Sequence, residues 1–319
     1  LLRVTVPTHR LDVQEGPADL IEDIVRLYGY DRVPTTLLSE PLPRQQANEA
    51  IRFEEKVRDL LGDCGLQEVV CYALTMPEKE APLLAGEPAY VRLKNPISSE
   101  RVVLRRSVLA SVVEVAANNL RHTGDVRLFE IGFAYVPRGG DAGGSSAGLP
   151  DEPRRLAIVM TGSRSREFWQ DDRAVGGMLD FFDIKGVVET LAADLHLNRP
   201  AYQTAKAAHL HPGQSATLTV ENASGERVTL GDFGVLHPKA GLTLGLGERV
   251  VLVADFDLDA LQAAAPVRFS YAPVPRFPAA LRDIAVVVDD AIPAERIEAE
   301  IRAAGGDLRL SVVGAAHGR

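Results

Sequence analysis

The sequence is poor in cysteine and has no long apolar run. Only two cysteines occur in 319 residues, Cys64 and Cys71, and they form no CxxC pair. This scarcity excludes a disulfide framework and a cysteine-based zinc site, and it fits a reducing compartment. No apolar stretch approaches the ~20 residues that a membrane-spanning helix needs. We therefore expect a cytoplasmic protein that does not enter a membrane.

An excess of basic residues is also lacking, since the formal net charge is -9 and the pI is near 5.4. Indiscriminate binding of nucleic acid depends on clustered lysine and arginine, so this balance excludes a surface built for it. Local contacts with RNA stay open. The chain has no GxSxG, no HExxH and no Cys/His dyad, which removes the common hydrolase and metalloprotease patterns.

The first residues, LLRVTVPTHRLD, include no initiating methionine and no charged leader followed by an apolar segment. They alternate as a strand does. We therefore expect that the sequence starts inside a domain and is a fragment of a longer protein.

What the chain does contain is enough apolar side chain, 46% of residues, for two or more compact units. Strand-like and helix-like segments follow one another without a strict βαβ rhythm, which predicts an α+β fold with a largely antiparallel sheet flanked by helices. The predicted helices cover 19–28, 47–61, 107–122, 178–195 and 293–306. The predicted strands cover 2–6, 66–75, 89–93, 126–136, 155–161, 215–220, 228–236, 249–256 and 283–289, with another from Leu308.

The stretch DLIEDIVRLYGYDRVP predicts a short helix from Asp19, as N-cap, through Tyr28. Gly29 suits the residue that closes a helix in the left-handed region, and Pro34 prevents continuation. The apolar stripe that we expect to be buried consists of Leu20, Ile21, Ile24, Val25 and Tyr28.

Four acidic residues gather around the start of this helix. Asp19, Glu22 and Asp23 lie at i, i+3 and i+4, on one face of the first turns, and Asp12 lies just upstream. Oxygen ligands of this kind suit Mg²⁺, which takes one or two protein carboxylates and keeps several waters. Acids at a helix N-terminus are also stabilised without any ion, by about 0.3–1 kcal/mol each. Spacing alone leaves both interpretations open.

Two further motifs invite a functional interpretation. HLHPG contains His209 and His211, and His237 recurs in a second His-Pro pair, so three histidines could bind zinc; proline after two of them indicates turns instead. LGLGERV (244–250) superficially resembles a glycine-rich phosphate loop. Its spacing is too loose and a strand-like segment follows, so we interpret it as a hairpin loop.

Several separated segments resemble, in order, one family, the beta subunit of bacterial phenylalanyl-tRNA synthetase. THRLDVQEGPADLIEDIVRLYGYDRVP is similar to its metal-associated domain, and LKNPISSERVVLRRSVLASVVEVAANNLRHTGDVRLFEIG to the core of its catalytic-like module. FDIKGVVETL, HPGQSA and GDFGVLHP resemble later parts of that module. PRFPAALRDIAVVV resembles the entry to its ferredoxin-like anticodon-binding domain.

The resemblance implies three parts. Residues 1–38 are expected to end the small metal-associated α/β domain, and residues 39–265 to form the class II synthetase-like, non-catalytic module. Residues 266–319 are expected to form an incomplete ferredoxin-like domain, because GAAHGR follows SVV where the family continues. The proofreading domain of the family lies upstream and is expected to be missing as well.

The resemblance also implies an assembly of two alpha and two beta subunits that joins phenylalanine to its tRNA using ATP, with the reaction on alpha. The sequence agrees with a non-catalytic role: Glu130 follows Phe129 directly, and the Arg-x-Glu arrangement of an ATP-binding class II motif is missing. Such a motif needs its arginine to neutralise phosphate charge. We assign no catalytic residue.

A Mg²⁺ site shared with alpha is implied at the acidic cluster, with Asp12, Asp19, Glu22 and Asp23 at the matching positions. The connection from Asp12 to Asp19 is one residue longer than usual in the family. Glu15 could substitute for a displaced Asp12, and Asp23, where Glu is commoner, could bind through a water.

Two alternatives come from other classes of protein. A free-standing metal-dependent enzyme would use the acidic cluster together with His209, His211 and His237. A pure RNA-binding module is disfavoured by the acidic balance of the chain.

Overall fold

The computed structural model describes residues 3–37, 39, 47–138, 149–165, 177–222, 224–266, 268, 271, 278, 280, 282, 284–289 and 291–305. By its internal contacts the chain divides into two compact units, Leu1–Val267 and Arg268–Arg319. The first unit contains the central sheet and, before it, a short segment that carries helix α1. Each is described by itself below.

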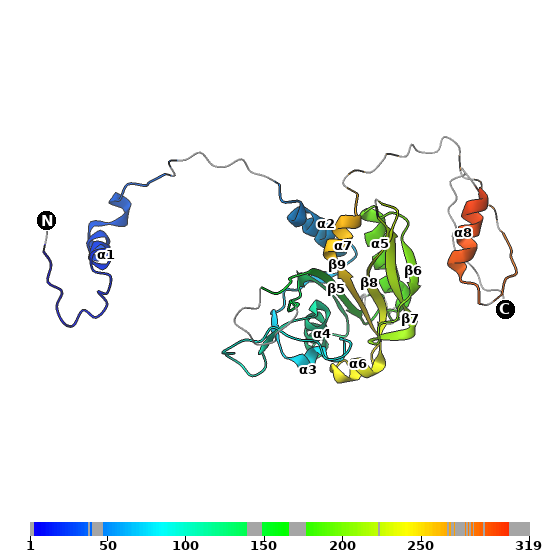
Figure 1. The fold of residues 1–319 in the computed structure, drawn as a ribbon, viewed down its shortest axis with the longest axis horizontal. Helices are drawn as coiled ribbons and strands as arrows, with labels where there is room; N and C mark the ends of the chain where they lie inside the picture. The colour runs from blue at the N-terminus through cyan, green and yellow to red at the C-terminus, as the bar shows by residue number, and fades with distance from the viewer. Residues whose placement is uncertain are drawn as a thin grey trace, which may run out of the picture. The chain divides into compact units, whose positions relative to one another are not determined.

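The core of the first unit is a seven-stranded sheet in the order β1-β4-β5-β9-β8-β7-β6 (Figure 1). All neighbouring strands are antiparallel except β1 and β4, which are parallel. The strands are β1 (Gln67–Glu68), β4 (Val126–Phe133), β5 (Arg154–Thr161), β6 (Ala201–Thr204), β7 (Leu210–Glu221), β8 (Arg227–Leu236) and β9 (Val251–Asp257). A mixed α+β architecture with a mostly antiparallel sheet is therefore what the structure has.

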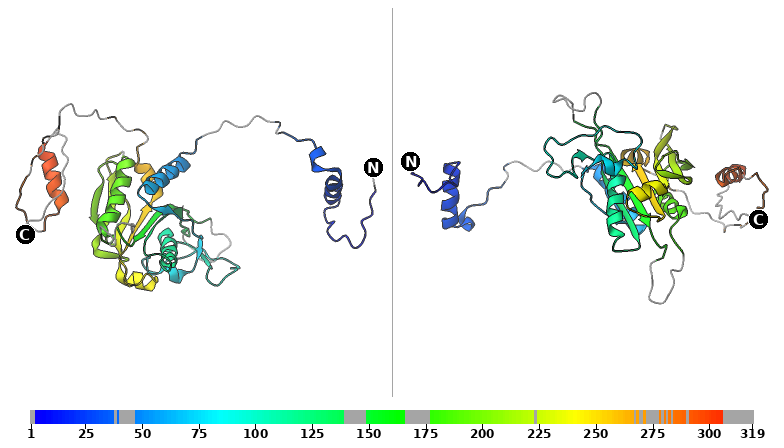
Figure 2. Two further views of the ribbon diagram at one scale, coloured as in Figure 1. Left: turned by 180° about the vertical axis from the view of Figure 1, so that it is seen from behind. Right: turned by 90° about the horizontal axis from the view of Figure 1, so that it is seen from below.

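Helices cover both faces of this sheet (Figures 1 and 2). On one face, α2 (Glu49–Asp63), α5 (Phe181–Asp194) and α7 (Leu258–Ala264) pack over a buried cluster that includes Ile158, Phe233 and Phe256. On the other face, α4 (Val108–Asn119) and α6 (Pro238–Thr243) pack over Ala157, Val159 and Val253. Alternate residues of a strand point to opposite faces, so each central strand contributes to both clusters.

Two of the central helices, α5 and α4, begin at polar caps that the sequence supplies. Asp180 and Asp183 form a reciprocal capping box at the start of α5, in which the carboxylate of each residue accepts a hydrogen bond from the backbone N–H of the other. Ser107 accepts a hydrogen bond from Ala110 N at the start of α4. Ile184, Val187, Val188 and Leu191 are buried along α5 at helical spacing, which gives that helix its packing face.

The first unit also contains a second, two-stranded sheet. It pairs β2 (Leu74–Thr75) with β3 (Val103–Leu104) in antiparallel register, and Arg92 forms an isolated bridge to Val103. The short helix α3 (Pro77–Glu80) follows β2. This sheet holds the segments 69–75 and 92–104 next to each other.

The N-terminal segment consists of extended chain, helix α1 (Pro17–Tyr28) and a single 3-10 turn, Tyr30–Arg32. Two predictions are wrong here: residues 3–6 form no strand, and the helix is preceded by Gly16, which places Asp19 inside the first turn. The predicted end is confirmed, since Gly29 has a φ of 104° and its N–H bonds to Val25 O. The stripe is not buried, because Ile21, Ile24 and Tyr28 remain more than half exposed.

Some of the other predicted helices and strands are confirmed by the structure and some are wrong. The helices of the central unit are confirmed with bounds shifted by a few residues, as are the strands at 126–136, 155–161, 215–220, 228–236 and 249–256. The strand predicted at 66–75 is wrong for most of its length, because only β1 and β2 form within it, and 89–93 holds only the bridge at Arg92. The edge strand β6 was not predicted.

In the second unit, helix α8 (Ala294–Gly305) confirms the predicted helix. Residues 284–289 form no strand, so that prediction is wrong for the described part of 283–289, and the strand expected from Leu308 lies outside the described residues. None of the helices in the described ranges is both long enough and apolar enough to cross a membrane.

Candidate functional site

The start of α1 holds the acidic cluster together with the loop that enters it. Asp19 lies in the first helical turn, and its Oδ2 accepts hydrogen bonds from the backbone N–H groups of Gln14 and Glu15, both at 2.7 Å. Pro17 occupies the start of the helix, where no N–H is needed. Asp19 therefore fastens the incoming loop to the helix.

Arg10 connects two of the other acids. Its Nη2 lies 2.7 Å from Asp12 Oδ2 and 2.7 Å from Asp23 Oδ2, and its Nε donates to Asp12 Oδ1 at 2.9 Å. The hydrogen bonds from this guanidinium hold the pKa of the Asp12 carboxyl below its usual range. The two carboxylates thus converge on a single cationic group.

The four predicted ligands are therefore only partly brought together. Asp12 and Asp23 converge, Asp19 is engaged with backbone N–H groups, and Glu22 lies exposed on α1. Glu15 contributes its N–H to Asp19 and is exposed. Within the described part of the chain, no three His, Cys, Asp or Glu side chains are grouped as a metal site would need. Two converging carboxylates still fit the chemistry of Mg²⁺, which completes its shell with water, so the site stays a prediction.

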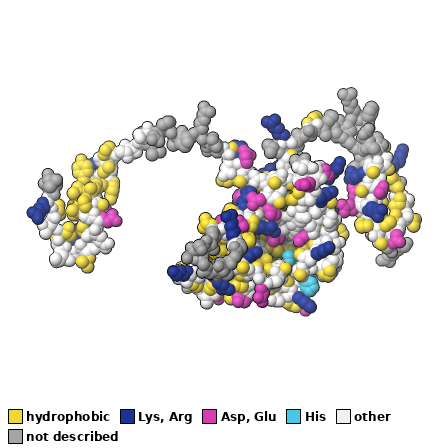
Figure 3. Space-filling view, in the orientation of Figure 1, with side chains coloured by type: hydrophobic (Ala, Val, Ile, Leu, Met, Phe, Trp, Pro, Cys, Tyr) yellow, Lys and Arg dark blue, Asp and Glu magenta, His cyan; other side chains and the backbone are white. Residues whose placement is uncertain are grey.

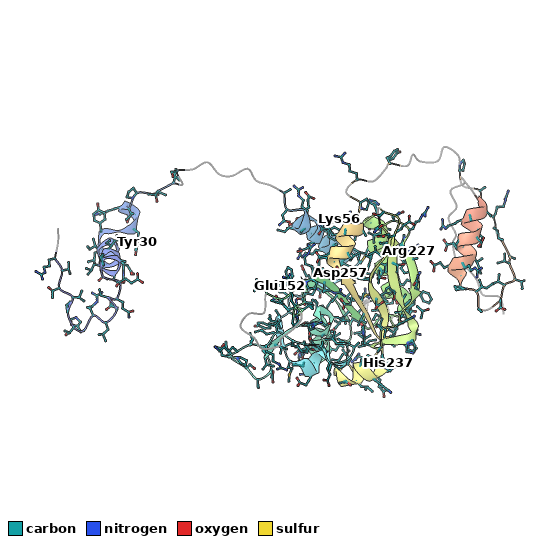
Figure 4. The ribbon with its side chains drawn as sticks, viewed as in Figure 1. Tyr30, Lys56, Glu152, Arg227, His237 and Asp257 are labelled. Atoms are coloured by element: carbon teal, nitrogen blue, oxygen red, sulfur yellow. The ribbon has the colours of Figure 1, made fainter. Side chains whose placement is uncertain are left out.

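The histidines that could have bound zinc have structural roles. His237 Nδ1 accepts from Lys239 N and caps α6, and Figure 4 shows His237 beside that helix. His211 Nδ1 accepts from Gly213 N at 3.2 Å within β7, where the register with β8 shifts, so the turn expected after His211 is not formed. The carbonyl oxygen of His209 accepts from His237 N at 2.8 Å. Neither these positions nor the comparisons below support a free-standing metal-dependent enzyme.

The stability of the fold is expected to depend on pH through His209. Burial lowers the pKa of His209, against the opposing effect of the Asp255 and Asp232 carboxylates. The folded state then binds fewer protons than the unfolded state, so the free energy of unfolding should fall as the pH drops below about 6.5, the ordinary histidine value. Urea unfolding between about pH 5 and pH 8 should show a shallower pH dependence for His209→Gln. His122→Gln, at an exposed position, serves as the control; equal slopes in the wild type and both variants would contradict the assignment.

A buried ion pair lies where β4 meets the segment before α4. Arg105 Nη2 is 2.9 Å from Glu130 Oε1, with side-chain exposures of 4% and 3%, and Arg105 Nε donates to Phe133 O. A Cβ atom at Gly132 would lie 2.3 Å from Arg105 Nη2, so this glycine makes room for the pair. The backbone N–H of Cys71 also donates to Glu130 Oε1.

This pair shows what Glu130 does. Its carboxylate is neutralised inside the protein, by an arginine 25 positions earlier in the sequence. Arg127, the nearest preceding arginine on β4, donates to the carbonyl oxygens of Ser163 and Arg164. The pair could not be identified from the sequence, because its only local signal was an arginine between apolar residues and a capped helix.

The LGLGERV segment connects α6 to β9, so the prediction of a hairpin loop is wrong. No helix follows it, which agrees with the argument against a phosphate loop. Together with the end of β8 and with α6, it lines a cavity of about 320 Å³ that is walled mainly by Val235, Leu236, Leu242, Val250 and Val251.

Comparisons with known proteins place these features in context. Residues 33–258 match the family model described as the phenylalanyl tRNA synthetase beta chain CLM domain, and residues 1–30 match the tRNA synthetase B5 domain. The phenylalanine–tRNA ligase beta subunit of Moorella thermoacetica is 35% identical over 320 residues, covering 97% of this chain and 37% of the relative.

The beta subunits of Bacillus cereus and Vibrio cholerae are 36% and 35% identical, over 97% and 96% of this chain. They are covered over 37% and 36% of their own length. The chain thus spans little more than a third of the length of these relatives.

Proposed function

Because the chain belongs to the phenylalanyl-tRNA synthetase beta chain family, we propose that it is the non-catalytic part of a phenylalanine–tRNA ligase, docking on a catalytic alpha subunit. The observation that carries this proposal is the match of one family model to residues 33–258, most of the chain. The complex uses ATP to attach phenylalanine to its tRNA, in the cytoplasm. The proposed assembly contains two alpha and two beta subunits.

The central unit would serve as a class II synthetase-like module without its own reaction. The buried Arg105–Glu130 pair supports this view, because a carboxylate held by an internal arginine does not orient a nucleotide. Arg127 is likewise engaged with carbonyl oxygens. We extend the proposal to the three parts expected from the sequence: residues 1–38 in the metal-associated domain, 39–265 in this module, and 266–319 in a ferredoxin-like domain that helps bind tRNA.

Exposed apolar side chains on the β2–β3 segments support docking on another subunit. Val70 is 91% exposed, Tyr72 is 72% exposed and Ile97 is fully exposed. Arg101 stacks on the Tyr72 ring at 4.1 Å, which presents a cation beside these apolar groups. Exposed apolar groups that are rimmed by polar ones are typical of protein interfaces. We propose that segments 69–75 and 92–104 contact alpha.

Co-purification tests this interface. The chain and an alpha subunit of the family, co-expressed with a tag on alpha only, should elute together. Ile97→Asp should weaken the complex by about ten-fold or more, since a charge would be buried at the contact. Leu242→Asp, which places the same charge at an exposed leucine on α6, should leave binding unchanged. If Ile97→Asp binds alpha as tightly as the wild type does, the proposed location is wrong. If the wild type itself does not co-purify with alpha, the chain does not dock on it.

We also propose that Mg²⁺ binds at the start of α1, between this chain and alpha. Asp12 and Asp23 would hold the ion directly or through water, with Glu22 and Asp19 completing the acidic surroundings. The ion would supply a positive charge that links carboxylates of the two subunits. The support is the convergence of two carboxylates on one cation in this structure.

The segment that carries α1 also has an exposed apolar face. Figure 3 shows hydrophobic side chains over much of its visible surface, and Leu27 is 92% exposed. A helix with such a stripe needs a neighbour to bury it. We propose that the complete subunit supplies that neighbour.

A further inference from the structure

The guanidinium of Arg10 occupies the position between carboxylates that the proposed ion would need. One nitrogen atom, Nη2, is 2.7 Å from oxygens of both Asp12 and Asp23. The two acids come from different elements, since Asp12 lies on the entering loop and Asp23 on α1. A single cationic atom therefore closes the gap between loop and helix, as a metal ion would.

The guanidinium of Arg10 contacts both carboxylate oxygens of Asp12. Arg10 Nε donates to both oxygens of Asp12, at 2.9 and 3.0 Å, while Nη2 reaches Oδ2. The Asp12 carboxylate thus has both of its oxygens in contact with the guanidinium. A divalent ion that bridges Asp12 and Asp23 from the position of Arg10 Nη2 must displace Arg10.

The contacts are also of a kind that can be exchanged. Side-chain exposures are 37% for Arg10, 65% for Asp12 and 38% for Asp23, so water and ions reach the cluster. Exposed ion pairs of this sort are weak. Arg10 lies on the loop between two turns, outside any helix or strand, so its long side chain can turn outward without breaking secondary structure.

We propose that Arg10 is the resident counter-cation of Asp12 and Asp23 and that it competes with a divalent cation for the same oxygens. This inference rests on the Mg²⁺ site of the proposed function. In the absence of the ion, Arg10 keeps the loop and α1 together; when the ion binds, Arg10 is released toward solvent. The apparent metal affinity is then lowered by the fraction of molecules in which Arg10 is in place.

The test measures binding of Mn²⁺, a paramagnetic substitute for Mg²⁺, by titration calorimetry and by the electron spin resonance signal of the free ion. It is done on the whole chain and on its complex with alpha. Arg10→Gln keeps much of the length and a hydrogen-bond donor but removes the charge. It should tighten Mn²⁺ binding by about five- to ten-fold, a factor within the range expected if the two exposed ion pairs of Arg10 must first be broken.

Three variants make the result specific. Arg10→Lys keeps the charge and should bind the ion close to the wild-type affinity. Arg3→Gln removes a positive charge from an exposed position of the same segment, and it should also stay close to the wild type if competition, and not general charge, is responsible. Asp23→Asn in the Arg10→Gln background should lose the gain, because the ion would lack one of its two carboxylates.

Each outcome of the Mn²⁺ titrations either supports the competition or overturns it. Tighter binding by Arg10→Gln alone supports the competition. If the wild type binds Mn²⁺ and Arg10→Gln binds it equally or more weakly, then Arg10 positions the loop and the inference is overturned while the Mg²⁺ site stands. If neither the wild type nor Arg10→Gln binds Mn²⁺, alone or with alpha, the proposed site fails, and the inference fails with it.

Discussion

Glu130→Ala is expected to destabilise the central unit by about 3–5 kcal/mol, because Arg105 would stay buried with no opposite charge. Both side chains are almost completely inaccessible, so solvent cannot replace the lost partner. The Cys71 N–H would also lose its acceptor. Urea unfolding monitored by circular dichroism gives the free energy directly, and a loss below about 1 kcal/mol would show that the pair is not buried in solution.

A double variant separates the charge from the packing. Replacing both residues with methionine, Arg105→Met with Glu130→Met, removes both charges and leaves similar volume. This variant should be clearly more stable than Glu130→Ala. Arg105 Nη1 and Glu130 Oε2 have no hydrogen-bond partner in the part of the chain that the structure describes, so the pair is incompletely satisfied and an apolar replacement is tolerated.

Glu80→Ala is the second large change, and it should cost about 3–5 kcal/mol. Glu80 is fully buried at the end of α3, where its carboxylate accepts from Arg106 N and Ser107 N at 3.0–3.1 Å and from the Tyr90 hydroxyl. Alanine would leave these buried and partly buried donors without an acceptor, at a cost of about 1–3 kcal/mol for each one that stays out of reach of water. The entry of the chain into α4 depends on these bonds.

Glu80→Gln is the matched control, because its amide oxygen can still accept while its NH₂ group cannot. An intermediate loss of stability is expected, again from urea unfolding. Glu78→Ala, on the same short helix α3, should have a small effect, since its side chain takes part in none of these bonds. Equal losses for Glu78→Ala and Glu80→Ala would show that helix content, and not the buried carboxylate, is being measured.

The sheet and its main helices could be predicted from the sequence because their signals are local. β5 contains an uninterrupted apolar run from Leu156 to Met160, and α5 combines a capping box with buried residues at helical spacing. The strand β6 carried no such signal, since AYQT is half polar and forms an exposed edge. Its pairing with β7 is set by the sheet and not by its own residues.

At 66–75 a strand was predicted that is mostly not formed, because the apolar residues 69–74 favoured one continuous strand. There the chain leaves the large sheet after β1 and joins the small one at β2, so Val70 and Tyr72 stay outside both. Hydrophobicity alone does not distinguish a buried strand from a surface that awaits a partner.

The candidate site could be located from the sequence only in outline. The spacing of Asp19, Glu22 and Asp23 correctly placed three acids on the first turns of one helix. It did not indicate that Asp19 would bind backbone N–H groups or that Arg10 would take two carboxylates, because both depend on how the loop folds back. The Arg105–Glu130 pair was hidden for the same reason, since its residues meet only after the sheet forms.

We propose that this chain performs no reaction itself and supports one on another subunit. Phenylalanine-dependent exchange of pyrophosphate into ATP, measured with the purified chain, with alpha, and with both together, tests it most directly. Exchange should be at background for the chain alone and should be high for the mixture. Exchange by the chain without alpha would contradict the account.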